Sequence, residues 1–354
     1  MFGKSYYNRL SGAVSQVYTR FQKDEFIKQA LEPLATLSLN ERMRHTSKLL
    51  RQHLPDEYKK AVNILKKVAP LVDRGYTALV FPDFVSQFGI HDFTTSLDAL
   101  HFFTSFGSSE FAIRTFLKMD FDRTINVMQD WSLDKNEHVR RLASEGSRPR
   151  LPWSFKLDEV IKYPEKTGRI LENLKEDESL YVRKSVANHL NDITKDSPTY
   201  VLELIQGWNQ QHIHTQWIIK RGCRSLFKIG DKQSLKVFNY TADVSVAVKK
   251  FSATSTLKIG DTLKFEFDLV SQSKNAQKLM VDFKIHYVKK SGQLSAKVFK
   301  LKEIELKAGE TVALSKTQRF QDFTTRKHFA GKHKLEIVVN GEVVKKCTFE
   351  VLKK

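Results

Sequence analysis

The stretch Asp134–Trp153, which reads DKNEHVRRLASEGSRPRLPW, decides the fold of the first part of this chain. Apolar and small residues recur at helical spacing from Val139 to Gly146, which predicts an amphipathic helix. Pro149 and Pro152 cannot continue that helix, and we expect Gly146 to end it in a left-handed conformation. The segment therefore predicts a helix that stops abruptly and is followed by a short, rigid loop.

The same stretch gathers positive charge around one carboxylate. Glu145 lies in the predicted last turn, where the helix dipole disfavours an anion. A carboxylate at that position needs a compensating partner or a function. The neighbouring residues that offer one are Arg140, Arg141, Arg148 and Arg150, and the indole of Trp153 closes the segment.

The pattern of this stretch recurs along the chain. Asp134-x4-Val-Arg-Arg is echoed 43 residues later by Asp177-x4-Val-Arg-Lys. A third unit, from Trp217, places Lys220, Leu226 and Ile229 36 residues after their counterparts in the second. Periods of roughly 40 residues are typical of HEAT-type helical repeats, which stack into a curved solenoid. We expect such an all-α solenoid over residues 1–236.

Amphipathic patterns fill the rest of this region. Pro33 and Pro55 interrupt them. The expected helices before Asp134 cover residues 8–32, 40–54, 56–73, 83–89, 95–106, 109–119 and 122–131.

The pattern changes near residue 237 from helical to alternating. Alternating runs at 243–251, 262–270, 278–288, 296–306, 311–320 and 334–352 predict strands, the last run folded back at the hairpin signal Asn340-Gly341. About seven short strands in this length are typical of an immunoglobulin-like β-sandwich. We therefore expect a second, all-β domain at 237–354. All four tryptophans lie before it, and we expect Trp131, Trp208 and Trp217 to be core residues.

The charge balance favours a polyanionic partner. The 354 residues carry a formal net charge of +19, and the expected sandwich contributes 23 basic against 12 acidic residues. Only two of those 23 are arginine, which suits diffuse contact with phosphates. Duplex DNA is the favoured partner, and an anionic membrane surface is the rival. No transmembrane span or signal peptide is evident, so we expect a soluble cytoplasmic protein that, in bacteria, shares the nucleoid's compartment.

The sequence offers no motif for a cofactor or a metal. It lacks a P-loop, a Gly-x-Ser-x-Gly motif and a zinc-deaminase signature. Cys223 and Cys347 are too far apart in sequence to indicate a thiolate site, and His212 with His214 supply two ligands without a third. We expect no cofactor and no metal, and a monomer suffices.

Three strings resemble the signatures of the AlkC branch of the HEAT-like-repeat DNA glycosylases. They are Ser108–Arg114 (SSEFAIR), His138–Trp153 (HVRRLASEGSRPRLPW) and Tyr181–Asn191 (YVRKSVANHLN). Some members of that branch also carry an immunoglobulin-like domain. Thr115 stands where the family pattern has proline. The resemblance implies a monofunctional glycosylase that removes cationic alkylated bases, 3-methyladenine and 3-methylcytosine, from duplex DNA without base flipping.

The resemblance also implies roles for three residues. Loss of a cationic base leaves oxocarbenium character on the sugar, which carboxylates can stabilise while they hold a water. Glu110 and Glu145 are the candidates, with Trp153 as an aromatic wall. Without the resemblance, the sequence favours a role for Glu110 in stabilising the start of its helix. For Glu145, it favours catalysis and an ion pair with Arg141 about equally.

Basic residues at equivalent or adjacent repeat positions suggest a groove for the phosphate backbone rather than an ordinary solvated face. The predicted DNA-binding residues are Arg114, Arg140, Arg141, Arg148, Arg150, Arg183, Lys184, Lys220 and Arg221. Two other classes of function stay open. One is a non-catalytic HEAT-repeat scaffold that binds DNA or protein, and the weaker one is a membrane-surface binder.

Overall fold

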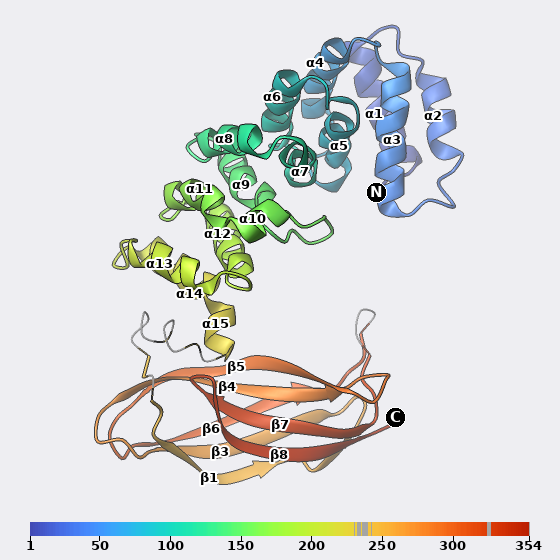
Figure 1. Ribbon diagram of the computed structural model, residues 1–354. Coiled ribbons are helices and arrows are strands. Elements are labelled where there is room, and N and C mark those ends of the chain that lie inside the picture. Colours follow the sequence, from blue (N-terminus) through green and yellow to red (C-terminus); the bar gives the residue numbers. More distant parts are fainter. Residues whose placement is uncertain (230, 232–234, 236–239, 242, 324–326, 354) are drawn as a thin grey trace. The chain divides into compact units, whose positions relative to one another are not determined.

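The computed structural model describes residues 1–353 apart from 230, 232–234, 236–239, 242 and 324–326 (Figure 1). The chain divides into two compact units, Met1–Gly222 and Cys223–Lys354. The expected domain boundary at residues 236 and 237 falls outside the described residues, as does the side chain of Ile229.

Helices form the first unit and the start of the second. The α-helices are α1 Lys4–Val17, α2 Lys23–Leu31, α3 Leu39–His53, α4 Tyr58–Val68, α5 Val80–Phe88, α6 Phe93–Phe103, α7 Glu110–Met119, α8 Phe121–Trp131, α9 Glu137–Gly146, α10 Asp158–Lys162, α11 Gly168–Asn173, α12 Leu180–Ile193, α13 Pro198–Gln206, α14 Ile213–Gly222 and α15 Arg224–Ile229. Short 3-10 turns cover Ala69–Leu71, Tyr76–Leu79 and Pro164–Thr167.

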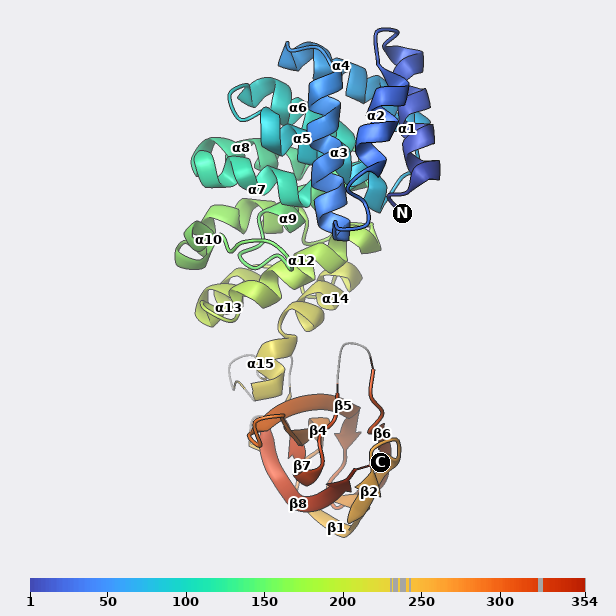
Figure 2. The same ribbon diagram turned by 90° about the vertical axis from the view of Figure 1, so that its right-hand side faces the viewer.

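The three repeat units predicted from the spacing pack in series. Helix α9 packs against α12, and α12 packs against α14 (Figures 1 and 2). Each helix turns its apolar residues inward: Val139, Val182 and Ile218 are fully buried. The prediction of stacked helical repeats is confirmed.

The expected single helix over 8–32 is instead two helices. Tyr18 adopts an extended backbone after Val17, with φ −132°. The chain then turns so that Phe21 packs its ring 5.1 Å from that of Phe26. Burial of this aromatic pair favours the turn over a continued helix.

Two of the three tryptophans expected in the core are there. Trp131 and Trp208 are 8% and 4% exposed. Trp217 is only half-buried, although Arg183 and Arg221 lie over its ring at 5.9 and 5.5 Å. The expectation for Trp217 was therefore wrong.

The second unit is a β-sandwich. Its strands are β1 Val246–Ala253, β2 Thr256–Lys258, β3 Thr262–Ser271, β4 Gln277–Val288, β5 Leu294–Leu306, β6 Thr311–Arg319, β7 Gly331–Val339 and β8 Glu342–Leu352. One sheet has the order β1-β3-β6 and the other β2-β8-β7-β4-β5. Of the strands in the described residues, the short β2, which pairs in parallel with β8, is the one that was not predicted.

Alternation explains why these residues form two facing sheets. In β3, Leu263, Phe265 and Phe267 are buried while the residues between them face away from the core. The β7–β8 hairpin turns at Asn340 and Gly341, whose φ angles of 45° and 85° suit the primed turn that the Asn-Gly pair predicts. Across the described residues, no helix combines the length and apolar character that a membrane span requires.

Candidate active site

Helices α7 and α9 bring the two predicted carboxylates together. Glu110 is the first residue of α7, and Ser108 donates a hydrogen bond of 2.9 Å to its Oε2. Glu145 lies in the last turn of α9. Arg141, one turn earlier on α9, forms an ion pair with Glu110 and lies 3.6 Å from Glu145 Oε1. One guanidinium therefore joins both carboxylates.

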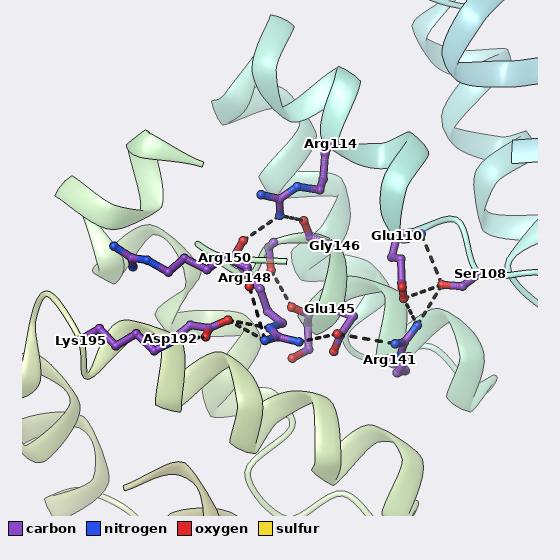
Figure 3. A network of polar contacts seen from close by, with 12 residues as sticks. Ser108, Glu110, Arg114, Arg141, Glu145, Gly146, Arg148, Arg150, Asp192 and Lys195 are labelled. Carbon is purple, nitrogen blue, oxygen red and sulfur yellow. Dashed lines mark hydrogen bonds and ion pairs between the residues drawn. The ribbon is translucent and has the colours of Figure 1, made fainter. Parts of the chain in front are cut away.

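This pair belongs to a longer row of alternating charges (Figure 3). Arg148 Nη1 lies 2.6 Å from Glu145 Oε1, and its Nη2 lies 2.7 Å from Asp192 Oδ2. Lys195 then pairs with the other oxygen of Asp192 at 2.9 Å. Each buried carboxylate thus contacts cations on both sides, which offsets the cost of burying it.

Glu110 and Glu145 line the same cleft, whose volume of about 860 Å³ lies in the range typical of ligand sites. The opposite side of the cleft comes from α3, α5 and the turn before α5. The cleft lining also includes Trp153. Both carboxylates therefore reach one solvent-accessible space, which a catalytic role requires.

The loop after α9 presents Trp153 to solvent. Its exposed fraction is 92%, and its backbone adopts a left-handed conformation with φ 63°. Such a conformation is strained for a large residue and persists only when the surrounding structure holds it. Trp153 is therefore not a core residue but an indole held at the edge of the cleft.

The predicted role of Arg114 in binding DNA is contradicted by its burial. The side chain is 0% exposed. Its guanidinium donates to the carbonyl oxygens of Gly146 and Arg148 at 3.0 and 2.7 Å, and to that of Phe155. Burial lowers the pKa of Arg114 to about 10. Arg114 fastens both ends of the loop that carries Trp153 and has no surface to offer a phosphate.

Gly146 does not end α9 in a left-handed conformation, so that prediction was wrong. Helix α9 includes Gly146, and Ser147 follows with φ −91°. A Cβ atom on Gly146 would lie 2.5 Å from Ile113 Cγ2 and 3.1 Å from Met128 Cε. Glycine is required here because α7 and α8 approach the helix closely.

The repeated arginines Arg140 and Arg183 have a structural explanation. Arg140 donates to the carbonyls of Asp134 and Lys135 at 2.9 and 3.0 Å. Arg183 makes the same two bonds, at 2.9 and 2.8 Å, to the turn before its own helix. Each arginine ties its helix to the preceding turn, so recurrence by itself does not indicate a phosphate groove.

The other predicted DNA-binding residues divide by exposure. Arg148 is only 7% exposed, because Glu145 and Asp192 surround it. Although burial opposes its charge, these two carboxylates raise the pKa of Arg148. Arg150 forms a half-exposed pair with Asp196. The exposed cations of the set are Lys184, Lys220 and Arg221.

Asp192 and His189, both on α12, were missed by sequence reasoning. Asp192 is 4% exposed and completes the row of charges. His189 is fully buried, which lowers its pKa to about 3. No repeat position or spacing marks either residue, since only packing of α12 on α9 brings them near Arg148. Within the described ranges, no group of three or more potential ligands could hold a metal ion.

We predict that Arg114→Lys loosens the loop that carries Trp153 while changing the stability of the whole fold only slightly. A lysine keeps the charge but cannot span three carbonyls with its single nitrogen. Susceptibility of residues 147–156 to limited proteolysis should rise, while the melting temperature falls by only about 2–5 °C. Unchanged proteolysis would show that the loop does not depend on Arg114.

Comparisons with known proteins agree with this architecture. Residues 247–353 match the family described as "Uncharacterised protein YhaZ, C-terminal Ig-like domain", which confirms the immunoglobulin-like assignment. The uncharacterised protein YhaZ of Bacillus subtilis is 41% identical over 353 residues, which cover 99% of this chain and 98% of YhaZ.

A solved structure extends the similarity to a protein with a stated activity. It is the Pseudomonas fluorescens alkylpurine DNA glycosylase AlkC, bound to DNA that contains an abasic site analogue. The two chains are 45% identical, with a TM-score of 0.95 over 99% of this chain and 98% of that one. With helical repeats, an immunoglobulin-like domain and identity at this level over the full length, this chain belongs to the AlkC family.

Proposed function

We propose that this protein is a monofunctional DNA glycosylase that hydrolyses the N-glycosidic bond of cationic alkylated bases in duplex DNA. We further propose 3-methyladenine and 3-methylcytosine as its substrates, excised without base flipping. The observation that carries the proposal is the convergence of Glu110 and Glu145 on one cleft through their shared partner, Arg141. A chain of the AlkC family with this arrangement has the groups that the reaction needs.

The chemistry follows from charge. A base that is already cationic departs with the electrons of the glycosidic bond, and positive charge develops on the sugar. Glu110 and Glu145 stabilise that charge and orient a water, which adds to the sugar carbon and loses a proton. The products are a free base and an abasic site. Their arginine partners lie within ion-pair distance of both carboxylates, which offsets the cost of burying these groups in the cleft wall.

Trp153 supplies an aromatic surface beside this reaction. An exposed indole in a held backbone conformation can pack against the deoxyribose or attract the cationic base. The lysine-rich sandwich adds a second surface for phosphates. In this proposal, the DNA-binding cations are the exposed ones, Lys184, Lys220 and Arg221.

One assay tests the proposed function directly. Duplex DNA treated with a methylating agent is incubated with the protein, and the released bases are identified by chromatography. We expect 3-methyladenine and 3-methylcytosine in the supernatant and alkali-labile abasic sites in the DNA. Folded protein that binds the duplex but releases no base would support the alternative of a non-catalytic scaffold.

We predict that Trp153→Ala lowers the rate of base release about tenfold while the melting temperature changes by less than about 2 °C. The indole is almost fully exposed, so its removal costs little packing energy, whereas the loss of a cation–π contact is worth roughly 1–2 kcal/mol. Single-turnover kinetics and thermal unfolding separate the two effects. An unchanged rate would exclude Trp153 from the site.

A further inference from the structure

The wall of the cleft opposite Glu110 and Glu145 contains a cation that the reaction does not use. Arg44, on α3, lines the cleft together with Asp83, on α5. Of the described residues that line the cleft, Arg44 alone is a lysine or an arginine. It therefore differs from the arginines described above, which support the carboxylates from behind or fasten the backbone.

A buried carboxylate holds Arg44 in place. Its Nη2 lies 3.1 Å from Asp83 Oδ1, and the exposed fractions of the two side chains are 54% and 6%. Gln87 donates a 2.6 Å hydrogen bond to the other oxygen of Asp83. In the same region, Ser47 of α3 donates to the carbonyl of Val80 at 3.1 Å, which joins the two helices. Arg44 is thus anchored at one nitrogen and open to the cleft elsewhere.

Two other arginines of α3 show what a purely structural arginine looks like here. Arg42 donates to the carbonyls of Leu37 and Leu34, and Arg51 donates to those of Pro55 and Asp56. Their guanidinium groups are directed to the backbone of this chain. Arg44, by contrast, has Asp83 on one side and the cleft on the other.

We infer that Arg44, positioned by Asp83, binds a backbone phosphate of the DNA strand whose damaged nucleotide lies at Glu110 and Glu145. The inference rests on the proposed function. A deoxyribose at those carboxylates is joined to a phosphate on each side, so part of the strand must lie along the same cleft. A guanidinium held at one edge and open at the other suits a phosphate, which it can bind through two parallel hydrogen bonds.

The first test is the salt dependence of binding. The probe is a duplex that contains an abasic-site analogue, and its Kd is measured by fluorescence anisotropy between 50 and 300 mM KCl. Over this range of salt, each phosphate contact should weaken the affinity by somewhat less than about tenfold. Arg44→Gln should lower the magnitude of the slope of log K against log[salt] by about 0.9 and raise Kd about tenfold. The matched control is Lys60→Gln on α4, which removes one exposed charge outside the cleft and should leave both values unchanged.

A second variant distinguishes the positioning of Arg44 by Asp83 from the general attraction between DNA and the net positive charge of the protein. Asp83→Asn raises the net positive charge by one, so general attraction predicts tighter binding. If Asp83 positions Arg44, affinity falls instead, about threefold, because the guanidinium must be ordered on binding. Tighter binding by Asp83→Asn would overturn the positioning role. An unchanged salt slope in Arg44→Gln would overturn the phosphate contact.

Failure of the inference is distinguishable from failure of the proposed function. The anisotropy assay uses an uncleavable duplex, so it reports binding whether or not base release occurs. If the unaltered protein releases no base but Arg44→Gln still lowers the magnitude of the salt-dependence slope, the proposed activity fails and the phosphate contact stands. If base release occurs and the slope is unchanged, the activity stands and the contact fails.

Discussion

Glu145→Gln should slow the release of 3-methyladenine at least about a hundredfold, the loss typical when one electrostatic group aimed at a transition state is removed. Glutamine keeps the shape of the side chain and can still accept from Arg148, but it cannot offer negative charge to the developing sugar cation. Arg148 retains Asp192 as its ionised partner, so the fold should persist. The measurement is single-turnover base release with saturating protein.

Binding and a matched substitution complete this experiment. The Kd for duplex DNA should change by less than about twofold, because removal of the buried carboxylate alters transition-state stabilisation more than ground-state binding. Glu203→Gln on α13 makes the same chemical change at an exposed residue and should leave the rate unaltered. Full activity in Glu145→Gln would refute the catalytic role.

Arg148→Met should destabilise the fold by about 3–5 kcal/mol, the usual cost of removing one partner from a buried ion pair. The side chains of Glu145 and Asp192 are 8% and 5% exposed, and Arg148 is the group between them. Without it, two buried carboxylates lose their nearest shared cation. Thermal unfolding should show a melting temperature lower by roughly 10 °C.

A double variant tests this reason. Adding Glu145→Gln to Arg148→Met should recover part of the lost stability, because it removes one of the two carboxylates that lost their shared cation. The control is Arg169→Met on α11, an exposed arginine, with an expected change within about 0.5 kcal/mol. A similar loss in both arginine variants would contradict the argument.

Three arginines that lie outside this row of charges show why the roles of individual arginines were hard to predict. Arg114, Arg140 and Arg183 stand in motifs that suggest contact with phosphates, yet all three donate to backbone carbonyls of this chain. A guanidinium can serve a phosphate or a turn equally well, and sequence spacing records only that it recurs. Exposure decides between the two, and exposure comes from packing.

The role of the carboxylate Glu145 was easier to predict from the sequence than the roles of the arginines. The position of Glu145 in the last turn of a helix is unfavourable for an anion unless something compensates it, and that conflict is visible in the sequence. What Glu145 contacts is not visible. Asp192 follows it by 47 positions and Arg44 precedes it by 101, and no local pattern joins them.

By itself, the sequence determined the elements and their order: stacked helical repeats, because apolar residues recur at helical spacing in units of similar length, then a sandwich, because the period changes to two and Asn340-Gly341 demands a tight turn. Only the tertiary structure decided which charged groups meet. Packing of α7, α9 and α12 joins Glu110 to Asp192, and packing of α3 on α5 sets Arg44 on Asp83. Periodicity is a local property that survives in one dimension, whereas an ion pair between distant residues depends on the angle and separation at which helices pack.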